Sequence, residues 1–466
     1  MRARSICTLV AAALLGGCAS FSPDGGFGVV EQTAQQRLGK ALRWSRSEAD
    51  QAAIDQRVAA LLAQPLSADD AVQLALLNNR GLQARLQELR IGQADLVQAG
   101  RLPNPGFAFG RLTRGSEVEI ERGLHFNLAR LLALPQMQQL EARRFTQTQG
   151  SVTLAVLALA AETRKAHIHA VATDESVRYR RQVMQAAEAS AELARRMAQV
   201  GNFNKLQQAR EQSFYADAAL NLAHAMQAQA ATRERLIRLL GLWGERAAFK
   251  LPERLPALPP APSEQPEIER SAMAQRLDVQ SAKLAAEQTA KNLGLTRSTR
   301  LVNVLELGAV RNSSNELPTQ RGWEVSVELP LFDGGDARVA RAEAVYRQAL
   351  DRAAETAINA RSEVREAYGH YRSSYDIARH HRDELVPLRK QIADENLLRY
   401  NGMLIGVFEL LADARTQIAS VNASIDALRD FWLADADLQM ALIGKPNLAA
   451  SATPLTTTAG DGGAAH

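Results

Sequence analysis

Histidines and carboxylates are the residues of this chain that could support acid–base or metal chemistry, and they occur in few groupings. His167 and His169 form an H-x-H pair, but residues two apart on a helix point to different faces, so we expect surface histidines and no metal site. His380 and His381 have no cysteine or acidic cluster at ligand spacing. The DGGD sequence at 333–336 lacks the length and ligand pattern of a calcium loop. We therefore predict no metal and no cofactor.

Motifs that mark enzymes are also missing from the sequence. It contains no phosphate-binding loop, dinucleotide fingerprint, nucleophile elbow or HExxH zinc motif. We therefore predict that the chain is not an enzyme.

Cys18 is the residue whose surroundings predict a covalent modification. The chain begins MRARSICTLVAAALLGGCAS, in which two arginines precede a short apolar run and then small residues, as in a signal peptide. That run is too short to be a permanent membrane span. The end, LLGGC, resembles the lipobox of bacterial lipoproteins, which implies removal of residues 1–17 and acylation of Cys18. The alternative is an ordinary secretory signal that contains this cysteine.

The two-cysteine count fits this interpretation. Cys7 leaves with the signal and Cys18 carries lipid, so the mature chain has no disulfide. Acyl chains contribute about 0.8 kcal/mol per buried methylene, which favours firm anchoring. By resemblance to lipoprotein sorting rules, Ala19 after the cysteine favours the outer membrane.

Composition predicts a mainly helical chain. Charged residues make up 23% and hydrophobic residues 46% of 466 residues, whereas aromatic residues make up only 5%. Alanine, glutamine, arginine, glutamate and leucine dominate, as in long helices packed by small side chains. The net charge of +4 includes Arg2 and Arg4 of the signal, and no basic block with interleaved aromatics predicts nucleic-acid binding.

The chain is internally duplicated, with an offset of roughly 200 residues. Residues 74–100 resemble 268–294, each is followed by a pair of strand-like patches, and each half ends in a similar sequence, RLLGL or ALIGK. Proline-rich residues 249–266 predict an extended connector. The predicted organisation is a signal peptide at 1–17, a lipidated N-terminal segment at 18–66 lying along the outside, a first repeat at 67–248, the connector, a second repeat at 267–446, and a disordered tail at 447–466.

Helix lengths predict columns of equal height. Stretches 135–200 and 336–400 would each span roughly 100 Å, and the shorter stretches 67–100, 203–240, 267–299 and 403–443 about half of that. Two shorter helices end to end therefore match one long helix. Such columns could form the wall of a tunnel, although a solid antiparallel bundle fits the pattern too.

The strand pairs near 106–129 and 302–330 constrain this choice. Alternation places Leu124, Phe126 and Leu128 on one face and His125 and Asn127 on the other, as in a membrane barrel with a wet interior. Four strands cannot close a barrel, whereas three chains would supply twelve strands.

The chain resembles the TolC family of outer-membrane efflux channels, especially its lipoprotein branch, over nearly the whole mature length. The resemblance lies in LALLNN from Leu74, QAGRLPNP from Gln98, VELPLFDGGDAR from Val327 and RYNGMLIGVFELLADAR from Arg399. It implies a homotrimer, in which a twelve-stranded β-barrel in the outer membrane continues into a long periplasmic α-helical barrel. It also implies two partners, a periplasmic adaptor and an inner-membrane pump of the resistance-nodulation-division class.

The same resemblance assigns residues to places in the channel. Pro330, Gly334 and Gly335 would form the junction between barrel and tunnel, whereas the first half has Pro135 in place of the double glycine. Gly201 and Gly402 would mark the hairpin tips that dock the adaptor.

Glu409 and Asp413 are the candidate aperture residues. Their spacing of four places both on one helix face, and threefold symmetry would cluster their charges. The alternative is that both are solvated surface charges.

Two other functions remain open at this point. A structural lipoprotein that braces the envelope without conducting would need no amphipathic barrel, and a channel for type I protein secretion would share the fold. The exported substrate does not follow from the sequence.

Overall fold

The computed structural model describes residues 20–299, 305–327 and 331–445, and these divide into two compact units. Of the described residues, the first unit contains those within 20–37, 84–155 and 277–358, and the second contains the others. Each unit therefore combines segments of both predicted repeats. Cys18, Pro330, the predicted signal peptide and the predicted tail lie outside the described residues.

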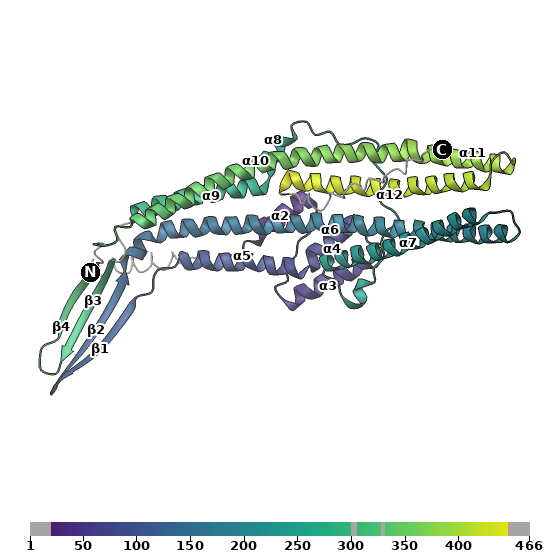
Figure 1. Ribbon diagram of the computed structural model, residues 1–466. Helices are drawn as coiled ribbons and strands as arrows, with labels where there is room; N and C mark the ends of the chain where they lie inside the picture. Colours follow the sequence, from purple (N-terminus) through teal and green to yellow (C-terminus); the bar gives the residue numbers. More distant parts are fainter. Residues whose placement is uncertain (1–19, 300–304, 328–330, 446–466) are drawn as a thin grey trace. The chain divides into compact units, whose positions relative to one another are not determined.

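The first unit contains one antiparallel sheet in the order β1-β2-β3-β4 (Figure 1). Its strands are β1 (Gly106–Arg114), β2 (Glu117–Asn127), β3 (Leu305–Ser314) and β4 (Gln320–Val327). β2 of the first repeat pairs with β3 of the second, with Leu124 opposite Ala309. The two predicted strand pairs are thus confirmed and joined into one sheet, whose edges are β1 and β4.

Helices that belong wholly or partly to the first unit are α2 (Phe27–Leu38), α5 (Arg80–Ala99), α6 (Leu128–Gln199), α9 (Leu277–Ser298) and α10 (Asp336–His380). The predicted start of the first long helix at Pro135 is wrong, because α6 begins at Leu128 and has Pro135 inside it. Asn127 explains the early start, since its side-chain oxygen accepts the N–H of Arg130 at 2.8 Å and so satisfies a free donor of the first turn.

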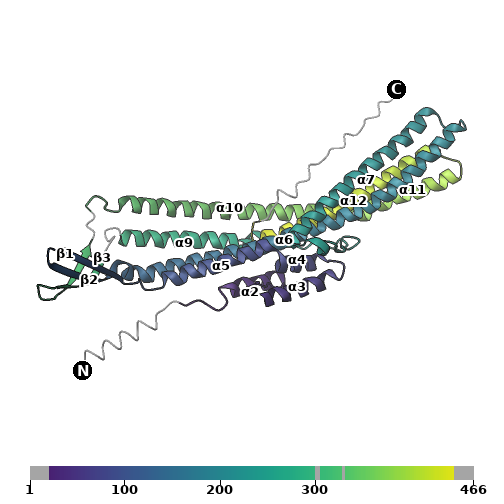
Figure 2. The ribbon, with the colours of Figure 1, turned by 90° about the horizontal axis from the view of Figure 1, so that it is seen from below.

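The second unit adds α3 (Glu48–Leu62), α4 (Ala68–Asn78), α7 (Lys205–Leu240), α8 (Ile268–Gln275), α11 (Val386–Asn401) and α12 (Val407–Ile443). Figure 2 shows α6 meeting α7 at one hairpin and α11 meeting α12 at another. Ser67 caps α4, accepting the N–H of Asp70 at 3.1 Å. A π-helical segment, His381–Leu385, precedes α11, and there the N–H of Val386 bonds back to His381. Pro387, which has no N–H, follows directly and accounts for the local change of hydrogen-bond register.

Two helices that the sequence predicts as continuous are each broken at the same place in their repeat. The stretch 67–100 divides at Asn79, and 267–299 divides at Arg276, where ψ is 116° and 123° respectively. Asn79 caps the next helix by accepting the N–H of Leu82 at 2.9 Å. Asn78 donates to the carbonyl of Leu240 at the end of α7, whereas Arg276, 1% exposed, pairs with Glu363 at 2.6 Å. Side chains at both breaks therefore bond to a neighbouring helix, α7 at its end and α10 within its length.

The second unit holds the larger buried clusters. Ile54 and Val58 of α3 are fully buried there, whereas the other residues of this helix are exposed or half-buried, so α3 packs on the body through one face. In the other cluster, Tyr375 donates its hydroxyl to the carbonyl of Pro260 at 2.8 Å, and Trp432 donates to that of Pro256 at 2.9 Å. The proline-rich connector, which is neither helix nor strand, is held by these bonds. Its missing N–H groups leave its carbonyls as the available partners.

No helix in the described part of the chain combines the length and apolar character needed to cross a bilayer.

Candidate functional site

The sheet has one apolar face that is open to its surroundings. Cross-strand pairing places Phe107 opposite Leu124, and Leu307 opposite Phe126 and Val325. Phe107 is 70% exposed and Trp323 is 77% exposed, which is unusual for large apolar side chains. We call the face that carries these side chains the apolar face. Its members are Phe107, Phe109, Leu124, Phe126, Leu307, Trp323, Val325 and Val327.

The opposite face, the polar face, carries acids and a histidine. His125 lies opposite Gly308, which lies opposite Glu324, and Asn127 lies opposite Glu306. The His125 ring covers two glycines, since a Cβ added at Gly123 or Gly308 would come within 2.8 Å of a ring nitrogen. The predicted alternation of Leu124 and Phe126 against His125 and Asn127 is therefore confirmed. Leu128 does not continue it, because it is already the first residue of α6.

The transition from β4 to α10 occurs at the predicted double glycine. Gly335 has a φ of +80°, a left-handed conformation that favours glycine, and its N–H bonds to the Asp333 side chain at 2.8 Å. α10 then begins at Asp336. Gly334 and Gly335 thus form the strand-to-helix bend. Pro330, the third residue predicted at this junction, lies outside the described residues.

The first hairpin tip joins α6 to α7 at Gly201, as predicted. Gly201 is left-handed with φ of +82°, and the N–H of Asn202 bonds back to the carbonyl of Met197 at 2.9 Å, which closes the helix end. Asn204 and Gln207 then form a capping box on α7, with reciprocal bonds of 2.8 and 2.9 Å.

The second hairpin tip joins α11 to α12 in the same way but with different residues. The N–H of Leu404 bonds back to the carbonyl of Arg399 at 2.9 Å, and the left-handed residue is Met403, with φ of +58°. Gly402 lies at the tip with φ of −81° and does not supply the turn. Gly406 precedes α12 without any side-chain cap. Sequence reasoning missed Met403 because a glycine stands one residue before it.

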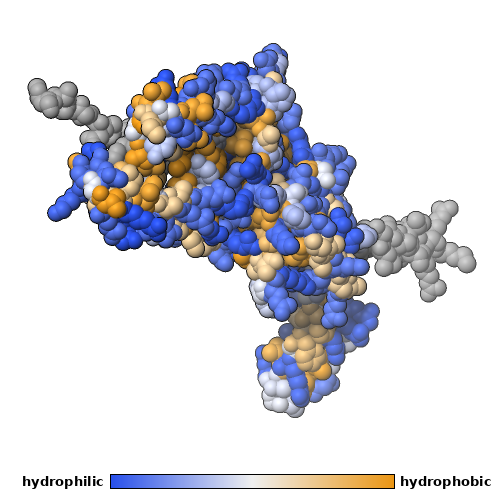
Figure 3. Space-filling view, turned by 90° about the vertical axis from the view of Figure 1, so that its right-hand side faces the viewer, coloured by the Kyte–Doolittle hydropathy of each residue, from blue (hydrophilic) through white to orange (hydrophobic). Residues whose placement is uncertain are grey.

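Both tips expose apolar side chains. Met403 is 93% exposed and Leu404 78% exposed, and Val200 and Leu206 of the first tip are mostly exposed too. Figure 3, which looks onto this end of the hairpins, shows apolar side chains among mostly hydrophilic ones. The tips therefore present surface suited to contact with another protein.

The two predicted aperture acids have different surroundings. Glu409 is exposed in the first turn of α12, where a carboxylate is favoured by the helix dipole. Asp413, one turn further, is half-buried and accepts a hydrogen bond from Asn396 of α11. No ion pair to a basic residue is present at either carboxylate within the described ranges. The structure thus places both on α12 near the tip, and one of them is held by the neighbouring helix.

An ion pair that the sequence did not indicate connects the two hairpins. Arg415 of α12 pairs at 2.7 Å with Glu211 of α7, whose side chain is buried. Ser190 of α6 donates to the other oxygen of Glu211 at 2.8 Å, and the Arg415 guanidinium lies over the Phe214 ring at 4.3 Å. The signal in the sequence was weak, since Glu211 and Arg415 are 204 residues apart.

The prediction that the H-x-H histidines lie on the surface is wrong for His167, which is buried, whereas His169 is half-buried. His167 donates from Nε2 to the carbonyl of Leu66 at 2.7 Å, and burial lowers its pKa. Burial, with a smaller effect of Arg429, lowers the pKa of His169 to about 4. Among the described residues, no group of three or more histidine, cysteine or acidic side chains could hold a metal ion.

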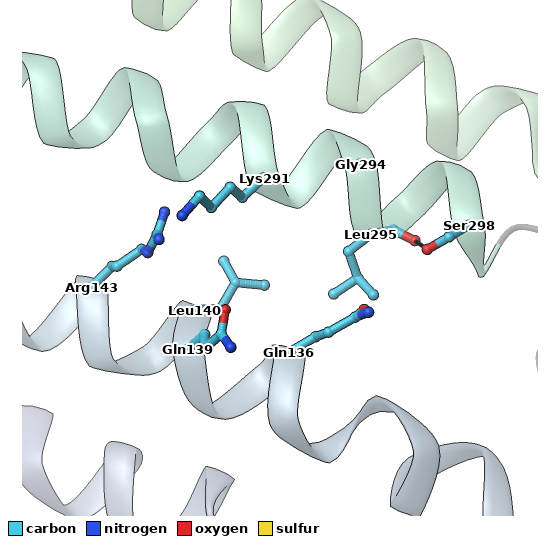
Figure 4. Close-up of a pocket in the computed structure, with 8 residues that line it drawn as sticks. All are labelled: Gln136, Gln139, Leu140, Arg143, Lys291, Gly294, Leu295 and Ser298. Carbon is cyan, nitrogen blue, oxygen red and sulfur yellow. Dashed lines mark hydrogen bonds between the residues drawn. The ribbon is translucent and has the colours of Figure 1, made fainter.

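A cavity of about 340 Å³ lies between α6 and α9 in the first unit (Figure 4). Arg143 and Lys291 extend into it from opposite helices with their nitrogens toward each other. Its other lining residues are Gln136, Gln139, Leu140, Gly294, Leu295 and Ser298. This lining includes no carboxylate and no histidine.

Comparison with known proteins identifies the fold. No protein-family model and no curated protein sequence matches the chain. Solved structures do match, among them a membrane protein from Pseudomonas aeruginosa with a TM-score of 0.70 and 19% identity, covering 80% of this chain and 92% of that one. The Campylobacter jejuni CmeC outer membrane channel has a TM-score of 0.69 at 16% identity, covering 80% and 85% of the two chains. The open Neisseria gonorrhoeae MtrE outer membrane channel has a TM-score of 0.66 at 17% identity, covering 80% and 88%.

The chain has the TolC-like fold. The predicted mainly helical fold class with a small sheet and the resemblance to the TolC family are thereby confirmed. In this fold the polypeptide changes direction at two kinds of place. One is the strand-to-helix bend at Gly334 and Gly335, and the other is the hairpin ends at Gly201 and Met403.

Proposed function

We propose that copies of this chain complete one another's sheets into a β-barrel that conducts solutes across the outer membrane. The observation that carries the proposal is an open sheet of four strands with an exposed apolar face, a polar face, and two unpaired edges, β1 and β4. Unpaired edges and exposed aromatic side chains are unfavourable in water, whereas in a barrel the edges pair and the apolar face contacts lipid.

Three copies would supply twelve strands, within the range of outer-membrane barrels. The polar face would then line the interior, with His125, Glu324 and Glu306 among its side chains. A lumen of this kind carries ions and polar solutes passively.

The wider assembly follows from the same fold. We propose an outer-membrane lipoprotein, anchored through Cys18, whose helices extend into the periplasm and whose hairpin tips dock a periplasmic adaptor that connects to an inner-membrane pump of the resistance-nodulation-division class. Support comes from the neighbours described as outer membrane channels and from the exposed apolar residues at both tips, such as Val200 and Leu404. Efflux of substrates supplied by the pump is the corresponding function.

Glu409 and Asp413 are proposed to narrow the closed pore. Symmetry would triplicate both, and clustered carboxylates attract cations and repel one another. In Glu409→Ala/Asp413→Ala we expect a larger closed-state conductance and weaker block by divalent cations. Unchanged conductance and cation sensitivity would assign both acids to the solvated surface.

Planar-bilayer conductance tests the channel itself, with two neighbouring residues as matched probes. We expect the purified protein to conduct, and a water-soluble methanethiosulfonate reagent to reduce the conductance of His125→Cys on the polar face. Phe126→Cys on the apolar face should be insensitive, because its thiol would face lipid. Absence of conductance, or equal reaction at both positions, would contradict the proposed channel.

A further inference from the structure

Three arginines occupy one cross-strand row on the apolar face of the sheet. Arg122 of β2 lies opposite Arg311 of β3, and Arg311 lies opposite Arg321 of β4. Phe109 fills the same row on β1. Arg122 and Arg321 lie two residues from Leu124 and Trp323 of that face, and Arg311 lies four residues from Leu307, so all three positions share it. We call Arg122, Arg311 and Arg321 the arginine row.

Such a row is unfavourable unless an anion lies beside it. Like charges directly opposite one another on neighbouring strands destabilise a sheet. The strand carboxylates Glu119, Glu121, Glu306 and Glu324 project from the polar face. Within the described ranges, no carboxylate forms an ion pair with any member of the arginine row, and Arg311 and Arg321 are exposed. An anion from outside the chain would therefore stabilise the arginine row.

The arginine row lies next to the loop of the β3–β4 hairpin, whereas on β2 it lies midway along the strand, and Ile120 and Val118 follow it on the same face toward the β1–β2 loop. The adjacent row on the helix side contains Phe107, Leu124, Ala309 and Trp323. Two residues along a strand correspond to about 7 Å. The Arg122 guanidinium donates to Ser313 at 3.2 Å, one row further toward the loops, where Arg111 also lies. The charge of Arg122 is thus directed away from the apolar rows.

This placement corresponds to a membrane interface. Aromatic side chains collect at the boundary of the hydrocarbon region, and arginine on the lipid side of a barrel is tolerated there, although it is costly at the midplane. α6 begins directly after β2, so the helices lie at one end of the strands and the hairpin loops at the other. With the helices in the periplasm, the arginine row lies toward the outer leaflet, beside the loop of the β3–β4 hairpin.

We propose that the arginine row binds the phosphate groups of anionic glycolipids in the outer leaflet of the outer membrane. The inference rests on the proposed insertion of the sheet as a barrel. Guanidinium groups suit this ligand because each presents a planar fork of donors that binds phosphate in a bidentate manner. Adjacent strands lie about 4.8 Å apart, close enough for one phosphate to contact two of the arginines.

Native mass spectrometry of the full-length protein, released from phosphatidylcholine nanodiscs containing lipid A, tests the proposal. We expect the wild-type protein to retain bisphosphorylated lipid A at least about tenfold better than fully dephosphorylated lipid A, because charge-assisted hydrogen bonds exceed neutral ones. Arg122→Gln/Arg311→Gln/Arg321→Gln should lose that preference. Arg114→Gln, which changes an arginine of the same sheet on the polar face, should keep it.

Two further measurements separate the possible failures. Arg311→Lys keeps the charge without the planar fork and should reduce the preference only in part. Conductance of each variant reports whether the barrel forms. A conducting triple variant that still prefers phosphorylated lipid A, or a wild-type protein with no preference, would overturn the assignment of the arginine row. A wild-type protein that does not conduct would instead defeat the proposed channel.

Discussion

The two hairpin tips share one backbone motif but differ in how well their residues suit it. In both, an N–H bonds back five residues to close the helix, from Asn202 to Met197 and from Leu404 to Arg399. The first tip places a glycine at the left-handed position and a capping box after it, whereas the second places Met403 there and has no side-chain cap. A non-glycine residue in this conformation costs about 1–2 kcal/mol. The second tip therefore stores strain that the first lacks, and is the easier of the two to rearrange.

Removing the connection between the hairpins should have the largest effect. Arg415→Ala leaves the buried Glu211 carboxylate without its cation and should lower the free energy of unfolding by about 3 kcal/mol. Guanidinium unfolding followed by circular dichroism measures this loss. Arg195→Ala is the matched control, because its pair with Glu192 is exposed and should contribute no more than about 0.5 kcal/mol. Equal losses of unfolding free energy in the two variants would show that the buried Glu211–Arg415 pair stabilises the fold no more than an exposed pair does.

Acidification tests a part of the second unit away from the tips, the helix α6 around His169. His169 has a pKa of about 4 in the folded chain and about 6.5 when unfolded, so the unfolded chain binds more protons between these values. Stability should therefore fall as pH drops below 6.5, by about 2 kcal/mol at pH 5 relative to pH 7.5. His169→Asn should flatten this part of the profile. A profile with the same slope in the variant would assign the pH dependence to other groups.

Substituting the left-handed residues should change the stability of the two tips in opposite directions. Gly201→Ala should destabilise the first hairpin by about 1 kcal/mol, because alanine is strained at positive φ. Met403→Gly should stabilise the second by up to about 1 kcal/mol, by relief of the same strain. Amide hydrogen exchange localised to residues around each tip measures both changes. If Met403→Gly lowers the protection of amide hydrogens in the second tip, Met403 is not strained there.

Changes to the helix caps should have effects no larger than those of the left-handed residues. Asn204→Ala removes the capping box of α7 and should cost about 1 kcal/mol, whereas Gly406→Asn adds a cap to α12 and should gain only a few tenths. The same exchange experiment reports each helix start separately. If Asn204→Ala leaves the protection of α7 unchanged, the capping box does not explain the difference between the tips.

What could be predicted from the sequence follows from how local each feature is. The alternation from Leu124 to Asn127 fixes the faces of β2 because a strand repeats every two residues, and the glycine pair at Gly334 and Gly335 fixes the bend before α10. These are properties of a few neighbouring residues, and the structure agrees with them.

Features that depend on distant partners were not predictable. The breaks at Asn79 and Arg276 exist because side chains there bond to Leu240 and Glu363, which lie far along the chain. Likewise, Glu211 and Arg415 gave no local signal of their pairing. At the second tip the sequence predicts the left-handed residue one position too early. The glycine is at 402, but the closing bond from Leu404 to Arg399 places the left-handed conformation at Met403.

The central claim is that β1 and β4 find their partners on other copies of the same chain, and the mass of the purified full-length protein in a mild detergent tests it most directly. The account predicts a particle containing three chains, in which a cysteine on β4 can be cross-linked to a cysteine on β1 of the next copy. A stable single chain, or an assembly that leaves both edges free of such cross-links, would contradict it.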